Sequence, residues 1–102
     1  MRLFDLVIKE FVSIVEALEQ DHAIEKGRIV IDREIFKTLL ERYGYMSFRG
    51  KTKVYKDLNF IIHDKNNYTM PYKQAGQKKT VRKVIFNYTT YQTIKSLLEK
   101  AE

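Results

Sequence analysis

Residues 68–88, YTMPYKQAGQKKTVRKVIFNY, carry the clearest structural signal in this chain. Two runs rich in β-forming residues, 68–73 and 80–88, flank a polar segment with a central glycine. This pattern is typical of a β-hairpin, and it places the tip at residues 73–79. Pro71 interrupts the first run, which predicts an edge strand or a bulge, because proline cannot donate a hydrogen bond within a sheet.

The chain before the hairpin shows first a helical and then a β-forming pattern. Apolar residues recur at helical spacing over residues 3–19 and predict an amphipathic helix. Leu6 and Val12 flank its apolar stripe and leave surface for a second contact, for which a homodimer through this helix is the expectation. Arg28–Ile31 is rich in β-branched residues and predicts a short strand.

Capping residues mark the ends of two further helices. Asp32 is expected to cap a helix that continues through Tyr43, and Gly44 is placed to end it. After the hairpin, Thr89 and Gln92 have the spacing of a capping box and predict the start of a last helix.

A second short helix is predicted between these two. Residues 45–51 read as a turn, after which Thr52 is expected to cap a helix that runs to about Asn59. Residues 60–62 then predict a short strand.

The composition is that of one folded domain. The chain has 102 residues, of which 44% are hydrophobic and 31% are charged, which suffices for a single core. The absence of cysteine excludes a disulfide scaffold, a thiolate zinc site and a cysteine nucleophile. No apolar run approaches the length of about 18 residues that would indicate a membrane-spanning helix. Charges at Asp5, Lys9 and Glu10 argue against a signal peptide, so a cytoplasmic protein is expected.

Positive charge is concentrated in one segment. The chain carries 19 basic and 13 acidic residues, for a formal net charge of +6. Residues 45–84 alone hold 10 basic and 2 acidic residues, whereas residues 1–44 hold 7 and 9. A concentrated basic surface attracts polyanions, of which nucleic acid is the commonest large one in a cell. A lysine-rich, solvated surface without a ligand is the alternative.

The order of predicted elements is helix, strand, helix, turn, short basic helix, basic hairpin, helix. With the strand at Arg28–Ile31, Gly44 between two helices and the basic tip at 73–79, residues 28–98 resemble the winged helix-turn-helix family. The resemblance implies an α+β fold, a single domain over residues 1–102, and binding of double-stranded DNA. In that family the second helix of the pair usually enters the major groove, and the hairpin, or wing, contacts backbone or minor groove.

Overall size and a composition rich in Lys, Ile and Tyr give a narrower resemblance. The chain is similar to small accessory proteins of mobile elements that bind the origin of transfer of conjugative plasmids. This resemblance implies sequence-specific DNA binding that marks the origin for a relaxase. A transcription regulator of the same fold is the alternative.

Two groups of residues are predicted to contact DNA. Cations beside a helix N-terminus suit phosphate, and the first group comprises Arg49, Lys51, Thr52, Lys53 and Lys56. Amides can read base edges while lysines hold phosphates, and the second group comprises Lys73, Gln74, Gln77, Lys78, Lys79 and Arg82. Because the short helix has no Asn or Gln before Asn59, the hairpin is expected to carry much of the recognition.

Catalysis is not expected. His22 and His63 are the only histidines, and no phosphate-binding loop, nucleotide fingerprint or metal-ligand spacing accompanies them, so no cofactor or metal is predicted. Three other interpretations stay open. The hairpin lysines could instead prevent sheet-to-sheet aggregation, and the domain could bind a protein rather than DNA. The hairpin tyrosines could stack on unpaired bases; they are Tyr68, Tyr72 and Tyr88.

Overall fold

The structure is a computed structural model, and it describes residues 2–73 and 76–101. Within these ranges the elements are α1 (Leu3–Asp21), β1 (Arg28–Ile31), α2 (Arg33–Glu41), α3 (Phe48–Asp57), β2 (Ile61–Ile62), β3 (Met70–Tyr72), β4 (Val81–Asn87) and α4 (Tyr88–Ala101). The strands form a small antiparallel sheet, so the predicted α+β class is confirmed. Along these same ranges no helix is long and apolar enough to cross a bilayer.

β4 is the centre of the sheet. It pairs with β1 on one side and with β2 on the other, so that Ile29 and Ile61 both lie opposite Phe86. Farther toward the hairpin tip it pairs with β3, where Pro71 lies opposite Arg82. In the described part of the chain β3 has no other neighbour, so Pro71 lies in an edge strand, as predicted.

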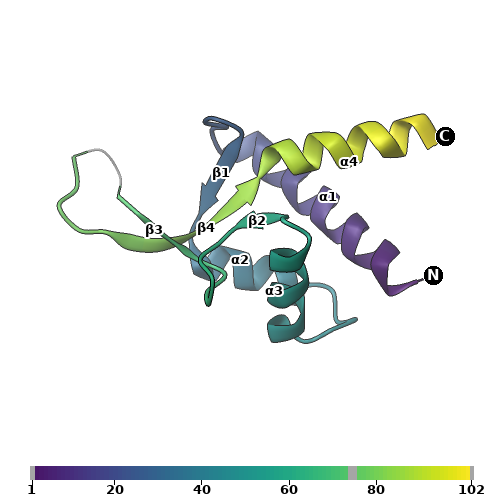
Figure 1. Ribbon diagram of the computed structural model, residues 1–102, viewed down its shortest axis with the longest axis horizontal. Helices are drawn as coiled ribbons and strands as arrows, with labels where there is room; N and C mark the ends of the chain where they lie inside the picture. The colour runs from purple at the N-terminus through teal and green to yellow at the C-terminus, as the bar shows by residue number, and fades with distance from the viewer. Residues whose placement is uncertain (1, 74–75, 102) are drawn as a thin grey trace.

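The hairpin of β3 and β4 projects from the body of the molecule. Figure 1 shows it on the side away from both chain termini, with α1 and α4 at the opposite end. The molecule is accordingly elongated, with a longest extent of 47 Å and two shorter ones of 28 and 24 Å. The strands β3 and β4 therefore extend one end of the molecule beyond its helical body.

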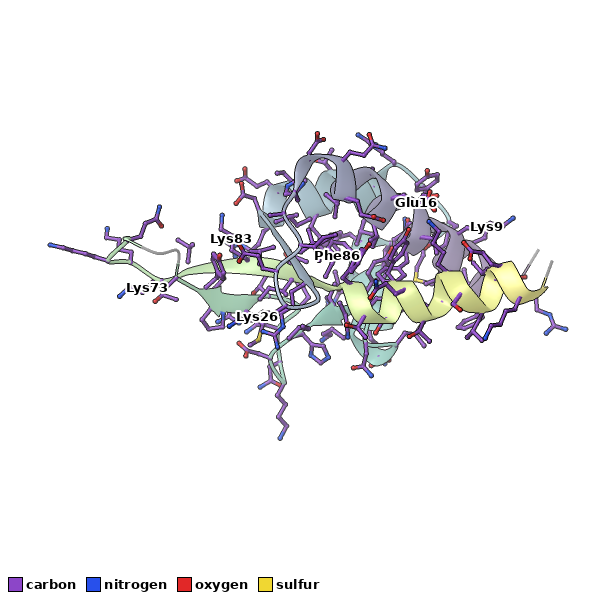
Figure 2. The ribbon with its side chains drawn as sticks, turned by 90° about the horizontal axis from the view of Figure 1, so that it is seen from above. Lys9, Glu16, Lys26, Lys73, Lys83 and Phe86 are labelled. Atoms are coloured by element: carbon purple, nitrogen blue, oxygen red, sulfur yellow. The ribbon has the colours of Figure 1, made fainter. Side chains whose placement is uncertain are left out.

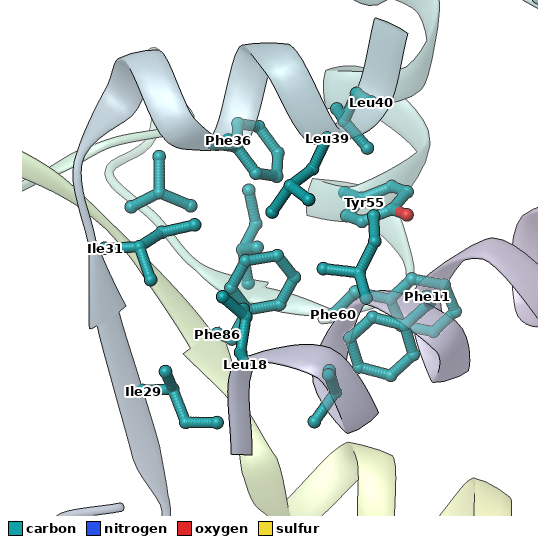
Figure 3. Close-up of a cluster of buried hydrophobic side chains, with 14 of the residues drawn as sticks. Phe11, Leu18, Ile29, Ile31, Phe36, Leu39, Leu40, Tyr55, Phe60 and Phe86 are labelled. Atoms are coloured by element: carbon teal, nitrogen blue, oxygen red, sulfur yellow. The ribbon is translucent and has the colours of Figure 1, made fainter. Parts of the chain in front are cut away.

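The core lies between the sheet and the helices, with Tyr91 as the buried contribution of α4, and aromatic rings fill much of it (Figure 3). Phe11 of α1 is fully buried and stacks on Phe60 with 4.0 Å between ring centroids. Phe36 of α2 meets Phe86 of β4 nearly edge-on at 5.7 Å. Each such buried side chain stabilises the fold by roughly 1.5–3 kcal/mol. The helix predicted over 3–19 is α1, and its apolar stripe faces this core.

The start of α3 differs from the prediction. Ser47 is its N-cap residue, and the Ser47 hydroxyl accepts a hydrogen bond from the Gly50 backbone N–H at 3.1 Å. Thr52 lies inside the helix instead, where its buried hydroxyl donates to the Arg49 carbonyl at 2.8 Å. Both residues are good caps. The earlier one begins the helix here, and the predicted turn at 45–51 shortens to the residues before Phe48.

The two ends of α2 also differ in part from the prediction. Asp32 occupies the N-cap position as predicted, but its carboxylate makes no capping bond and pairs with Lys83 of β4. The helix ends at Glu41, before Tyr43, so Gly44 lies within the turn toward α3 and not directly behind the helix.

Asn87, rather than Thr89, caps α4. The Asn87 side-chain oxygen accepts a hydrogen bond from the Thr90 backbone N–H at 3.1 Å. The helix begins at Tyr88, directly after the last residue of β4. The predicted capping box of Thr89 and Gln92 was therefore wrong by two positions, and no loop separates the strand from the helix.

Candidate nucleic-acid interface

Lys51 is buried, which corrects its prediction as a DNA contact. Its side chain is 1% exposed, and its Nζ lies 2.7 Å from Glu10 Oε2. The same ammonium donates to the carbonyls of Leu40, at 2.5 Å, and of Tyr43. All three ammonium hydrogens thus have acceptors. Lys51 therefore joins α3 to α1 and to the C-terminal end of α2, where helix carbonyls favour a positive charge.

Both oxygens of the Glu10 carboxylate accept hydrogen bonds. Its Oε1 accepts hydrogen bonds from the Tyr45 hydroxyl at 2.8 Å and from the Tyr55 hydroxyl at 2.7 Å. Burial, reinforced by the Glu10 charge and hydrogen bond, raises the pKa of the Tyr55 phenol, and it raises the pKa of Tyr45 in the same way. Glu10, Tyr45, Lys51 and Tyr55 form what we call the Glu10 cluster.

Stability is expected to fall at alkaline pH because of this cluster. An unfolded tyrosine loses its proton near pH 10, whereas folding raises the pKa of Tyr45 and Tyr55 above that value. Below about pH 10 both states hold these protons, and above it the folded chain holds more, so the free energy of unfolding decreases as pH rises. Urea midpoints between about pH 8 and pH 11 measure the decrease. It should be shallower for Tyr55→Phe, and equal slopes would contradict the assignment.

The exposed face of α3 carries the other cations of the first predicted group. Arg49 and Lys53 are exposed and Lys56 is half-buried. Together with Asn66 and Asn67, from the loop that follows β2, they line a groove of about 560 Å³. The structure thus brings two separate segments together around one charged hollow, and the second segment was not among the predicted contacts.

The hairpin group lies at the far end of the molecule. Figure 2 shows Lys73 out on the projecting arm, whereas Lys83 lies back against the body. Gln74 falls outside the described residues. The exposed members of the group that are described are Lys73, Gln77, Lys78 and Lys79.

Arg82 binds the protein's own loop. Its Nε donates to the Thr69 hydroxyl at 2.8 Å, and a terminal nitrogen donates to the Thr69 carbonyl at 2.8 Å. The same terminal nitrogen forms an ion pair with Asp64. This geometry differs from the predicted DNA contact, because the guanidinium holds the 64–69 loop against the base of the hairpin.

Most cations of the basic segment remain unpaired. Lys51, Arg82 and Lys83 are in ion pairs with Glu10, Asp64 and Asp32. Among the residues that the structure describes, seven other cations of the segment form no ion pair: Arg49, Lys53, Lys56, Lys65, Lys73, Lys78 and Lys79. They lie on α3, on the loop that follows β2 and on the hairpin. The uncompensated charge predicted for residues 45–84 is thus concentrated on these three elements.

Two of the three tyrosines proposed for stacking are held by the protein itself. Tyr68 stacks on Phe36, with 5.7 Å between centroids, and contacts Phe48 edge-on. The Tyr88 hydroxyl donates to Glu19 Oε2 at 3.0 Å. Tyr72 of β3 is half-buried.

A second groove, apolar in lining, lies between α1 and α4. It has a volume of about 380 Å³ and includes Phe4 and Ile8 of α1 and Ile94, Leu97 and Leu98 of α4. Phe4 and Leu97 are more than half exposed, at 55% and 60%. The two residues from which a homodimer contact was expected lie elsewhere: Leu6 lines a different pocket, beside Ser13 and Tyr43, and Val12 packs against the core.

The described side chains gather no three His, Asp or Glu residues in a way that could hold a metal ion. Neither a scan against models of protein families nor a search of curated proteins finds a match for this chain. The basic surface and its geometry are therefore the basis for inferring what the protein binds.

Proposed function

We propose that this protein binds double-stranded DNA and does so without catalysing a reaction. The observation that carries the proposal is the set of seven cations on α3, the loop after β2 and the hairpin that form no ion pair with any described residue. A duplex presents a regular row of phosphates, and a surface with several separated cations neutralises more of them than a single pocket can.

In this proposal the chain is a winged helix-turn-helix protein. The element order supports it, because α2 and α3 are joined by a turn and the β3–β4 hairpin projects beside them. α3 would face the major groove, and the hairpin would serve as the wing. Gln77 supplies an amide at the hairpin tip for a base edge, and Lys78 and Lys79 supply phosphate contacts.

The biological role that we propose is that of an accessory factor at the origin of transfer of a plasmid, with a relaxase as its partner in conjugation. Its support is the resemblance in size and composition to such accessory proteins. A transcription regulator of the same fold is the alternative. A homodimer through the N-terminal helix stays a prediction.

The test is a fluorescence polarisation titration against a random duplex at several salt concentrations. About six phosphate contacts predict a slope of log K against log salt near −5, so affinity should fall roughly a thousandfold between about 50 and 200 mM salt. A flat salt response would overturn the proposal. If the duplex is not bound even at low salt, the basic surface must serve a protein partner instead.

A further inference from the structure

We infer that the groove between α3 and the 64–69 loop is a second base-reading site for duplex DNA, in which Asn66 and Asn67 contact base edges. The inference rests on the proposed DNA binding and extends it, because the base contacts predicted from the sequence lie in the hairpin. The following observations support it.

The loop supplies the chemistry that α3 lacks. The exposed face of α3 offers cations but no amide, since the helix sequence FRGKTKVYKD contains neither Asn nor Gln. Asn66 and Asn67 line the same groove as Arg49 and Lys53. An asparagine amide can donate and accept at once, which matches the paired groups that adenine presents in the major groove.

Both amides are available to a ligand. Asn66 and Asn67 are exposed, and within the described part of the chain neither side chain has a hydrogen-bond partner. A nucleic acid would therefore replace only water at these groups. The cost of breaking internal bonds is absent.

The loop is anchored on both sides of the asparagine pair. On one side, Asp64 is ion-paired to Arg82. On the other side, Tyr68 packs on Phe36, and Thr69 is buried at 3% exposure and accepts hydrogen bonds from Arg82. A loop anchored at both ends loses less backbone freedom on binding than an unanchored loop, so it suits recognition better.

The groove is lined by charges of both signs. Arg49 lies near the N-terminal end of α3, where helix N–H groups also favour an anion. Asp57 lines the groove at the other end of the helix, about 12 Å away along its axis. Lys53 and Lys56 line the groove between and beside them, so its lining carries three cations and one carboxylate. The cations suit phosphates, and the Asp57 carboxylate can accept a hydrogen bond from the exocyclic amino group of a base.

The experiment first selects preferred duplexes from a randomised library with the parent protein. Affinities for the selected site and for each of its single-base variants are then measured for the parent, for Asn66→Ala/Asn67→Ala, and for Gln92→Ala. Gln92 is an exposed amide on α4, so it controls for the loss of a surface amide elsewhere. The asparagine variant is expected to lose discrimination of about 5- to 150-fold at one or two positions of the site, with its salt slope unchanged.

The outcomes separate the inference from the proposed function. If the parent binds no duplex, DNA binding itself fails. If the parent discriminates among bases and the asparagine variant discriminates equally well, only the second base-reading site is overturned. A uniform loss of affinity on all sequences also overturns it, because that result indicates backbone contact alone. Stronger binding of single strands than of duplex, lost with the asparagine variant, would assign the groove to unpaired bases instead.

Discussion

Lys51→Met is expected to lower the free energy of unfolding by about 3–5 kcal/mol. The substitution removes one partner of a buried ion pair and leaves the Glu10 carboxylate, 1% exposed, with only the two tyrosine hydroxyls beside it. It also leaves the carbonyls of Leu40 and Tyr43 without their donor. Urea denaturation followed by far-UV circular dichroism near pH 7 measures the change.

Two further variants show whether the buried charge is the cause. Lys53→Met makes the same change at an exposed position two residues away on α3, and its effect should stay within about 0.5 kcal/mol. Glu10→Gln/Lys51→Met removes both charges while keeping an acceptor for the tyrosines, so it should be more stable than Lys51→Met alone. Equal stability of the Lys51→Met and Lys53→Met proteins would contradict the burial of Lys51.

Replacing the three hairpin lysines with alanine, as Lys73→Ala/Lys78→Ala/Lys79→Ala, is expected to weaken duplex binding by about 10²- to 10³-fold at roughly 0.1 M salt. The reason is the loss of three phosphate contacts at the exposed tip of the molecule. The slope of log K against log salt should become shallower by about 3, or about 1 for each lysine. Polarisation titrations against one duplex give both quantities.

The matched control removes the same charge from other elements. Lys37, Lys95 and Lys100 are exposed on α2 and α4, and their triple alanine variant should retain most of the affinity. If both triple variants lose the same amount of affinity for the duplex, binding depends on the net charge of the protein and not on the hairpin. A larger loss in Lys53→Ala/Lys56→Ala than in the hairpin variant would make α3 the main contact.

Periodic segments were predictable from the sequence because their pattern is local. The helical spacing over residues 3–19 arises from one buried face, and α1 occupies those positions. The β-forming residues at 80–88 predict a strand, and β4 lies there, although Val84, Ile85 and Phe86 are buried in succession rather than in alternation. Helix starts were harder to predict. Ser47 and Thr52 are both suitable N-cap residues for α3, and Asn87 and Thr89 are both suitable for α4. The spacing of apolar residues alone does not show which of two suitable residues caps the helix.

The candidate site was only partly predictable for a different reason. In the sequence, nothing distinguishes Lys51 from the other cations of the basic segment. Its burial depends on a partner that is distant in the chain, Glu10, 41 positions earlier. Asn66 and Asn67 lie in a polar loop with no pattern of its own. They lie beside α3 because Arg82, 18 positions beyond Asp64, holds the loop there. The exposed cations were correctly placed on the surface because their position needed no distant partner.

The central position of β4 has a consequence for biosynthesis. Strands β1, β2 and β3 pair with β4, and within the described residues with no other strand. During synthesis the three earlier strands leave the ribosome first, and they have no strand to pair with until residues 81–87 are made. Sheet formation is therefore a late, long-range event. Because β4 also forms one arm of the hairpin, both the sheet and the projecting basic arm require residues 81–87.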